Sequence, residues 1–249
     1  MTDRTGRRVC LITDFGVRDP YAAAMKGVIL GICPRAIIED LSHEIAPQDI
    51  IEGALFLAAA APYWPEGTVF IAVIDPGVGT PRNALAISAG GRYFLCPDNG
   101  LISLYLQDHP LECAHTITNR VYLPDTISPT FHGRDVFAPA AAHLLKGVPI
   151  TELGDPIDRL TLLDVPEIEW LGGDQLEGEI IHIDRFGNAI TNVRREDLDG
   201  RAPFRISTRT NTIGCIVNTY GEAQPGHPLA LFGSTGYLEI AIREGNAST

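Results

Sequence analysis

Two aspartates directly follow strand-like runs of the sequence, where a carboxylate can take part in chemistry. Asp14 follows the apolar run 9–13, and Asp75 follows the most apolar run of the chain, 68–74. Open α/β sheets bind ligands beyond the carboxyl ends of their strands. An aspartate before Phe-Gly or Pro-Gly is also ordinary turn chemistry. Two aspartates at equivalent strand ends nevertheless favour a site.

The segment after the second of these strands has an unusual composition. Residues 75–82 read Asp-Pro-Gly-Val-Gly-Thr-Pro-Arg, with two glycines and two prolines. Such a backbone is rigid and can approach a ligand closely. Arg82 can fold back to pair with Asp75. The segment lacks the Gly-Lys-Ser/Thr and G-x-G-x-x-G patterns of nucleotide-phosphate loops, so that class of site is excluded.

His132 lies in a second candidate motif, Phe-His-Gly-Arg-Asp-Val-Phe at residues 131–137. It precedes an apolar helical segment, where functional polar groups are common. Arg134 and Asp135 are expected to pair with each other or to cap this helix. A histidine, an arginine and an aspartate together can orient and deprotonate a water. We interpret the other histidines considered as ordinary structural residues: His43, His109, His115, His143 and His227.

Two turn-like motifs in the second half of the chain offer groups for binding. In residues 183–192, Phe186 presents an aromatic face for a planar base, Asn188 a polar edge, and Asp184 a charge for a cationic group. Residues 232–237, Phe-Gly-Ser-Thr-Gly-Tyr, offer hydroxyls and free backbone amides. Turn formation alone explains the same residue types, so both interpretations stay open.

Strand-like and helix-like segments alternate in the first half and must position the first two motifs. The pattern predicts an α/β domain with a mostly parallel sheet. The expected strands are 9–13, 36–41, 68–74, 84–88 and 93–96. One helix is expected to begin at Asp19-Pro20, and three others are expected to cover 49–61, 99–107 and 134–145.

The second half contains short strand-like runs between glycine-rich turns and no convincing helix. The runs are 177–183, 189–193, 205–207, 212–218, 229–232 and 237–242. This texture predicts a small all-β, barrel-like C-terminal domain. We therefore expect an N-terminal α/β domain at 1–160 and a C-terminal domain at 174–249, joined by a linker at about 150–173.

Composition narrows the possible partners. The 31 acidic and 19 basic residues give a formal net charge of −12, which disfavours binding to a phosphate backbone. Five scattered cysteines without C-x-x-C indicate a reducing cytoplasm. There is no H-x-H or H-E-x-x-H, so no metal site is expected. The apolar stretch 54–61 is too short to span a membrane.

Taken in order, these segments resemble the S-adenosylmethionine hydroxide adenosyltransferase family, which is related to the adenosyl-fluorinase and chlorinase. The resemblance covers nearly the whole chain. The stretches that carry it are Ile12-Thr-Asp-Phe-Gly16 with Asp19, Ile74-Asp-Pro-Gly-Val-Gly-Thr80, Pro97 with Asn99-Gly100-Leu101, Thr130-Phe-His-Gly-Arg-Asp135, Ile183-Asp-Arg-Phe-Gly-Asn188 and Ser234 to Leu238.

The resemblance implies a fold, an assembly and a reaction. The family has an N-terminal α/β domain followed by a β-barrel domain. Its homotrimers place each site between the N-terminal domain of one subunit and the C-terminal domain of the next. The implied reaction is hydrolysis of S-adenosyl-L-methionine to adenosine and L-methionine by attack of water at the ribose 5′ carbon. S-adenosyl-L-methionine is then a small-molecule substrate, and no cofactor is implied.

The resemblance also implies roles for individual residues. The family's water-handling trio corresponds to Asp75, Arg82 and His132. The implied substrate contacts are Asp14 to the ribose hydroxyls, Asp19, Asp184 and Ser234 to the amino and carboxylate ends of methionine, and Phe186 and Asn188 to adenine.

Departures from the halogenating relatives bear on the choice of reaction. The fluorinase has tyrosine at the positions of Asp75 and His132, and Gly133 replaces its halide-contacting serine. Thr235 stands where the fluorinase has arginine, so Ser234 and backbone amides are expected to hold the carboxylate. The chain ends earlier than expected for the family, which bears on adenine contacts beyond Gly245. The alternatives are a halide adenosyltransferase and a non-catalytic adenosine or S-adenosylmethionine sensor.

Overall fold

A computed structural model describes residues 7–172, 174–198, 204–208 and 211–248. The chain divides into two compact units, Met1–Leu163 and Asp164–Thr249. The first unit combines helices with a six-stranded sheet, and the second contains the remaining strands.

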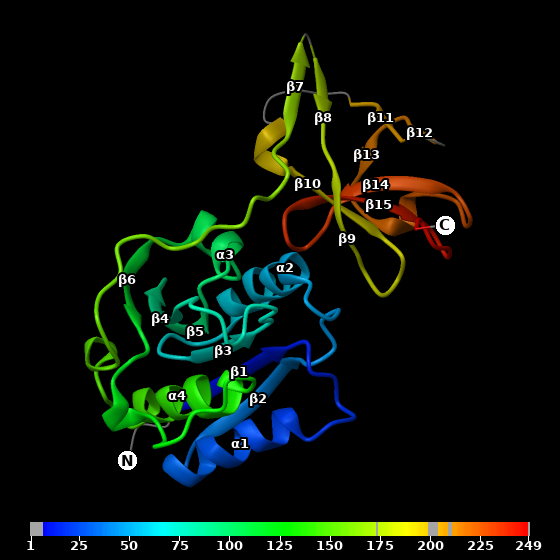
Figure 1. Ribbon diagram of the computed structural model, residues 1–249. Helices are drawn as coiled ribbons and strands as arrows, with labels where there is room; N and C mark the ends of the chain where they lie inside the picture. Colours follow the sequence, from blue (N-terminus) through cyan, green and yellow to red (C-terminus); the bar gives the residue numbers. More distant parts are fainter. Residues whose placement is uncertain (1–6, 173, 199–203, 209–210, 249) are drawn as a thin grey trace. The chain divides into compact units, whose positions relative to one another are not determined.

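The sheet of the first unit is mostly parallel (Figure 1). From one edge to the other its strands are β2 (Ile37–Ser42), β1 (Arg8–Thr13), β3 (Val69–Val73), β5 (Arg92–Pro97), β4 (Ala84–Ala89) and β6 (Leu111–Thr116). Strands β2, β1, β3 and β5 are parallel, whereas β4 pairs antiparallel with both of its neighbours. The hairpin between β4 and β5 therefore interrupts an otherwise parallel sheet.

Helices cover both faces of this sheet. Figure 1 shows α1 and α4 together on one face and α2 and α3 on the other. Their bounds are α1 Tyr21–Ile32, α2 Ile50–Ala60, α3 Ser103–Asp108 and α4 Ala138–Leu145. The shorter helices are η1 (Ala61–Tyr63), η2 (Arg120–Tyr122), η4 (Ile150–Glu152) and the π-helical turn η3 (Gly133–Phe137).

The core of the first unit explains why the central strands read as continuous apolar runs. All five residues of β3 are buried, because helices cover both of its sides. On the face of α1 and α4, Leu11 and Ile71 pack with Met25 and Phe137. On the opposite face, Phe70 stacks on Phe94, with ring centroids 5.2 Å apart. The packing on both faces holds the central strands in fixed register. It thereby fixes where the loops that follow these strands begin.

The register of β1 and β3 places their carboxyl ends side by side. The two strands are parallel neighbours, and Thr13 pairs with Val73. Asp14 and Asp75 follow these two residues closely in sequence, so both aspartates emerge at the same edge of the sheet.

The regular structure of the second unit is mainly β-strand. Its five-stranded sheet runs β13 (Ile216–Val217), β14 (Pro228–Phe232), β15 (Tyr237–Ile242), β10 (Ala189–Arg194) and β9 (Ile180–Ile183). Two ribbons accompany it, β7 (Glu169–Gly172) with β8 (Gln175–Glu177) and β11 (Ile206–Ser207) with β12 (Thr212–Ile213). The helices among its described residues are the short η5 (Arg195–Leu198) and η6 (Tyr220–Glu222).

The predicted mixed architecture is confirmed, with several differences in detail. Strands β6 and β7 were not expected. The expected run 177–183 is divided at Gly178 into β8 and β9, and the expected run 212–218 is divided into β12 and β13. The expected helix 99–107 begins only at Ser103. The expected helix 134–145 begins with a π-helical turn.

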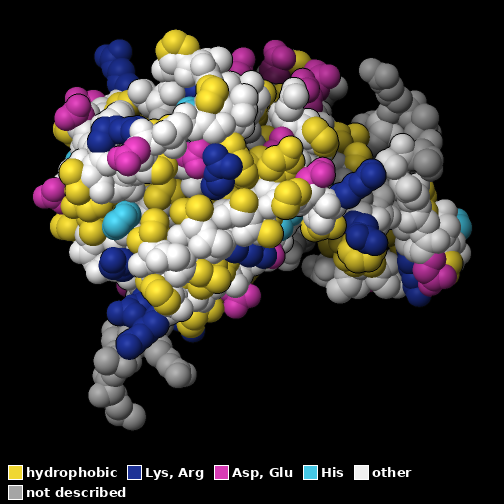
Figure 2. All heavy atoms as spheres, turned by 60° about the horizontal axis from the view of Figure 1, so that its bottom comes forward, with side chains coloured by type: hydrophobic (Ala, Val, Ile, Leu, Met, Phe, Trp, Pro, Cys, Tyr) yellow, Lys and Arg dark blue, Asp and Glu magenta, His cyan; other side chains and the backbone are white. Residues whose placement is uncertain are grey.

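The surface side chains, the cysteines and the helix lengths can be compared with what the sequence indicates. On the face shown in Figure 2, acidic, basic and hydrophobic side chains are interspersed. Cys10, Cys33 and Cys96 are buried, whereas Cys215 is exposed. No helix in the described part of the chain is long and apolar enough to cross a bilayer.

Candidate active site

The structure brings Asp75, Arg82 and His132 into direct contact. Arg82 Nε donates to Asp75 Oδ1 at 3.0 Å, and its Nη2 pairs with Asp75 Oδ2. The same Nη2 lies 2.8 Å from His132 Nδ1. The Asp75 and Arg82 side chains are only 6% and 10% exposed, so their pairing is largely shielded from water. The predicted pairing of Arg82 with Asp75 is therefore present, and it extends to His132.

The loop 75–82 is shaped by its own hydrogen bonds. Val78 N donates to Asp75 O at 3.2 Å, and Thr80 Oγ1 donates to Gly77 O at 2.7 Å. Gly79 has a φ of +80°, and a Cβ there would lie 2.7 Å from Pro129 O. Only glycine suits both the conformation and the close approach. The glycine thus lets the loop of Asp75 lie against the loop that leads to His132.

His132 is held at the entrance to the π-helical turn η3. Asp135, in this turn, accepts a hydrogen bond from Ser128 N at 2.8 Å and pairs with Arg134 Nε at 2.6 Å. The expected pairing of Arg134 with Asp135 is confirmed. These bonds fix both ends of the short segment that contains His132. π-Helical turns occur frequently at functional sites.

The contact with Arg82 determines which protons the His132 ring carries. A guanidinium only donates hydrogen bonds, so Nδ1 accepts and the proton of the neutral ring lies on Nε2. Burial and the positive charge of Arg82 hold the pKa of His132 below its ordinary value, against the opposing charges of Asp75 and Asp135. The ring is therefore neutral at physiological pH and presents an N–H donor on Nε2.

Asp14 is oriented by the loop that precedes α2. Its Oδ2 accepts a hydrogen bond from Gln48 N at 2.8 Å. Gln48 has a φ of +68°, an uncommon conformation for a residue with a side chain. Asp49, the next residue, caps α2 by accepting from Glu52 N. A strained backbone next to a helix cap thus directs an amide toward the carboxylate.

Three aromatic rings link the loop of Asp14 to the loop of His132. Phe15 lies 5.9 Å from Phe131 and 5.7 Å from Tyr21, and Tyr21 lies 5.3 Å from Phe131, in edge-to-face arrangements. Gly133 packs beneath them, since a Cβ there would lie 3.1 Å from Met25 Sδ and 3.3 Å from the Phe131 ring. The predicted residues Asp14, Asp75, Arg82 and His132 consequently lie on contiguous loops.

In the second unit, Asp184 organises the turn that contains the other predicted residues. Its Oδ1 accepts from Phe186 N and Asn188 N at 2.8 Å, and its Oδ2 accepts from Asn188 Nδ2 at 2.9 Å. The side chain of Phe186 is exposed, with 78% of the residue surface accessible. Asn188, by contrast, is buried. The turn interpretation of Asp184 is therefore correct, and the turn leaves the aromatic ring of Phe186 exposed.

The remaining predicted residues are exposed. Asp19 lies between Asp14 and α1, and Ser234 lies in the turn between β14 and β15. Within the described residues, no hydrogen bond or ion pair joins Asp19 to Asp75, Arg82 or His132.

Sequence reasoning missed one group that contacts the Asp14 loop. His43, interpreted as an ordinary structural histidine, contacts Thr13 through its ring and Gly16 through its carbonyl oxygen. Its partners lie on another segment of the chain, so no local sequence signal could have found it.

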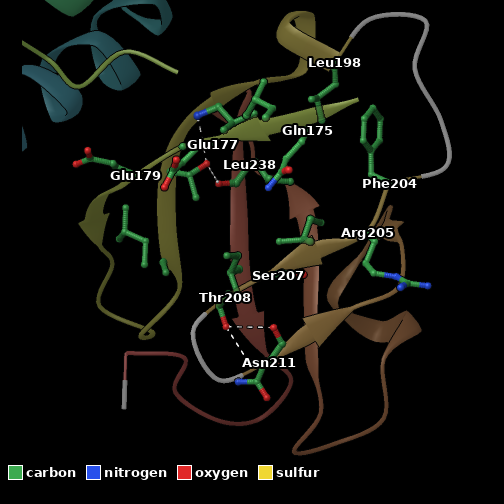
Figure 3. A pocket seen from close by; sticks show the side chains of 18 of the residues that line it. Gln175, Glu177, Glu179, Leu198, Phe204, Arg205, Ser207, Thr208, Asn211 and Leu238 are labelled. Carbon is green, nitrogen blue, oxygen red and sulfur yellow. Dashed lines mark hydrogen bonds between the residues drawn. The ribbon is translucent and has the colours of Figure 1, made fainter. Parts of the chain in front are cut away.

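A cavity of about 1160 Å³ lies in the second unit. Figure 3 shows Leu198, Phe204 and Leu238 at its wall, with the charged side chains of Glu177 and Arg205 nearby. None of the predicted site residues lines it. In the described part of the chain, no three His, Cys, Asp or Glu side chains are grouped to hold a metal ion.

Two models of one protein family together match most of the chain. Residues 9–154 match the model of the SAM hydroxide adenosyltransferase N-terminal domain, and residues 178–249 match that of the C-terminal domain. The chain belongs to the SAM hydroxide adenosyltransferase family. Both units carry the family's sequence features, as the motif order predicted.

Individual relatives of this member of the SAM hydroxide adenosyltransferase family align with nearly the whole chain. The (R)-S-adenosyl-L-methionine hydrolase of Thermus thermophilus is 41% identical, over 97% of this chain and 94% of the relative. A protein of the same name from Salinispora tropica is 35% identical, over 96% and 92%. The fluorinase of an Actinoplanes species is 30% identical, over 94% and 90%. A solved structure of an uncharacterized conserved protein from Thermotoga maritima has a TM-score of 0.89 at 32% identity, covering 96% of this chain and 94% of that one.

Proposed function

We propose that this protein hydrolyses S-adenosyl-L-methionine to adenosine and L-methionine. The observation that carries the proposal is the contact of Asp75, Arg82 and His132 at the edge of the sheet where Asp14 also emerges. Relatives at 41% and 35% identity are named hydrolases of (R)-S-adenosyl-L-methionine, so we take the R form at sulfur as the substrate. The fluorinase considered is less similar, at 30%.

The trio is suited to aligning a water for displacement at the ribose 5′ carbon. The Nε2–H of His132 donates to the water oxygen, and a free lone pair of the Asp75 carboxylate accepts one of its protons. Arg82 keeps both partners in place and adds positive charge beside the developing hydroxide. Fixing the nucleophile in line with the breaking bond lowers the barrier by up to about 7–11 kcal/mol.

The leaving group makes few further demands on the site. As the new C5′–O bond forms, the C5′–S bond breaks and its electron pair stays on sulfur. Methionine leaves as a neutral thioether, so no general acid is required. The second product is adenosine, and one proton is released to solvent. The proposed reaction needs no cofactor.

Substrate contacts follow from chemistry as well as from the family resemblance. Asp14 binds the ribose hydroxyls, since an ionised carboxylate is a strong acceptor for a vicinal diol. Phe186 stacks on adenine with its exposed ring, and Asn188 lies beside the adenine edge. Asp19, Asp184 and Ser234 hold the amino and carboxylate ends of methionine.

The proposed assembly is a homotrimer in which the second unit of one subunit completes the site on the first unit of its neighbour. The support is that the proposed ribose and water groups lie in one compact unit, whereas the proposed adenine groups lie in the other. The second unit is proposed to close into a barrel-like domain. The cytoplasm is the proposed location, in keeping with five unpaired cysteines.

Incubation of the purified protein with S-adenosyl-L-methionine tests the proposed reaction. Chromatography should show adenosine and methionine in equal amounts without added metal, with the R epimer consumed from an epimeric mixture. Chloride or fluoride present during the reaction should yield no 5′-halo-5′-deoxyadenosine. Tight ligand binding without turnover would instead identify a sensor, and a halogenated nucleoside would identify a halide adenosyltransferase.

A further inference from the structure

The loop that carries Asp14 is attached at several points to the segment that follows β2. Asp14 Oδ2 accepts from Gln48 N at 2.8 Å, and Gly16 N donates to His43 O at 2.7 Å. The His43 ring adds a side-chain contact, since its Nδ1 lies 2.8 Å from Thr13 Oγ1. His43 is therefore bonded to residues on both sides of Asp14.

Thr13 Oγ1 lies between a backbone amide and the His43 ring. Phe15 N donates to Thr13 Oγ1 at 3.2 Å, so this oxygen acts as an acceptor there. Its own hydroxyl proton can bond His43 Nδ1 when that nitrogen carries no proton. A neutral ring in this arrangement carries its proton on Nε2.

The far side of the His43 ring faces a carboxylate. His43 Nε2 lies 3.0 Å from Asp40 Oδ1, and Lys26 Nζ donates to Asp40 Oδ2 at 2.6 Å. Although burial opposes ionisation of Asp40, its contacts with Lys26 and His43 hold its pKa below the ordinary value. An anionic Asp40 favours the Nε2–H form of the ring, in which Nδ1 accepts the proton of the Thr13 hydroxyl.

We infer that His43 is a positioning residue for Asp14, acting through Thr13 and the backbone of the loop 13–16. The ring is buried, and its side-chain contacts are with Thr13 and Asp40. The His43 ring fixes the turn of the loop 13–16. The hydrogen bond from Gln48 N then fixes the orientation of the Asp14 carboxylate. This inference rests on the proposed function only in taking the ribose of an adenosine moiety as the ligand of Asp14.

Paired substitutions at Thr13 separate the hydrogen bond from the shape of the side chain. Thr13→Val removes the hydroxyl at nearly constant volume, and Thr13→Ser keeps it. Because the effect acts through Asp14, we expect Thr13→Val to raise the Kd for adenosine about tenfold in the wild-type background, but less than about twofold beside Asp14→Ala. Isothermal titration calorimetry with adenosine measures all the variants, and Thr13→Ser should restore most of the affinity.

Substitutions at His43 provide a second, independent comparison. His43→Asn places an acceptor near the position of Nδ1 and should keep most of the affinity, whereas His43→Leu should weaken binding as Thr13→Val does. His115→Asn is a matched control, because this buried histidine lies on β6 and bonds Gly154 O, after η4. Its adenosine Kd should stay at the wild-type value.

Amide hydrogen exchange tests the same inference without any ligand. Thr13→Val and His43→Leu should accelerate exchange at Phe15 and Gly16 more than at the other amides of the first unit. The inference is overturned if exchange there is unchanged, or if Thr13→Val weakens adenosine binding equally with and without Asp14. A wild-type protein that neither binds adenosine nor hydrolyses S-adenosyl-L-methionine would contradict the proposed function, while exchange would still decide how the loop is held.

Discussion

Arg82 is the residue that joins the proposed catalytic groups. Its guanidinium contacts the carboxylate of Asp75 through two nitrogens and His132 through one of them. Since the guanidinium stays protonated at any physiological pH, its partners must both be acceptors. Asp75 is consequently held as a carboxylate and His132 as a neutral ring with its donor on Nε2. The division of roles within the trio follows from this one side chain.

A substitution at Asp75 should separate turnover from binding. Asp75→Asn keeps the size of the side chain but removes the proton acceptor, so we expect kcat to fall by about 10²–10⁴-fold. The Kd for adenosine should change less than about threefold, because the substitution alters the water site and not the ribose contacts. Single-turnover kinetics and calorimetry measure the two quantities.

A distant carboxylate provides the control for this substitution. Glu112→Gln alters a carboxylate that bonds Ser88 and Gly91, near the turn between β4 and β5. It should leave both kcat and Kd at wild-type values. An Asp75→Asn protein with undiminished kcat would remove Asp75 from the mechanism.

The pH dependence of kcat/KM should report the state of His132. Protonation of Nδ1 would break its bond from Arg82, so activity is lost as pH falls through the pKa of the ring. Because burial and Arg82 lower this pKa, the acid limb should lie below 6.5, the ordinary value for histidine. At pH values above this acid limb, kcat/KM should stay constant until another group titrates.

Arg82→Gln gives the complementary result for the same titration. Without the neighbouring positive charge, the acid limb of the residual activity should move to higher pH. An acid limb unmoved by this substitution, in a protein that still folds, would show that another group controls the profile.

At the level of residues, the sequence was most informative about the site where a motif directly follows a strand. Asp75 and Arg82 share one short loop, so their pairing could be predicted from spacing. The contact of Arg82 with His132 spans fifty positions and required the fold, through Gly79 against Pro129 and the π-helical turn. His43 was passed over because its partners lie on other segments, and no local pattern distinguishes it from a core histidine.

At the level of elements, the π-helical turn η3 is the feature most closely tied to His132. Its wider hydrogen-bonded ring is not visible in the sequence, because the apolar spacing of residues 134–145 suits an ordinary helix as well. Strand β6 was missed for a related reason. Its sequence, Leu-Glu-Cys-Ala-His-Thr, has no clear alternation, and it becomes a strand by pairing with β4 at the edge of the sheet.

The attachment of η3 to the preceding loop should be measurable as stability. Asp135→Ala leaves Ser128 N without its acceptor and Arg134 without its partner. We expect a loss of about 2–3 kcal/mol in the free energy of unfolding by urea. Arg134→Gln should cost clearly less, since the Arg134 side chain is 41% exposed and its ion pair is screened by water. Equal losses from the two substitutions would show that the bond to Ser128 contributes little.

At the level of the whole molecule, the net charge of −12 agrees with a cationic substrate. S-adenosyl-L-methionine carries a sulfonium, and carboxylates from both units are proposed to surround it: Asp14, Asp19, Asp75 and Asp184. An acidic surface also raises the rate at which a cation arrives at the protein. On the face shown in Figure 2, acidic side chains lie among basic and hydrophobic ones.

The proposed sharing of sites between subunits predicts complementation between two inactive variants. Asp75→Asn disables the proposed water site of the first unit, and Asp184→Ala disables the proposed methionine contacts of the second. If each site combines units from neighbouring subunits, about a quarter of the sites in randomly mixed trimers contain two intact units. Co-expressed variants should therefore recover about a quarter of wild-type activity, in a particle of three 26.9 kDa chains by light scattering. Sites built within single chains would recover none, because every chain would carry one disabled unit.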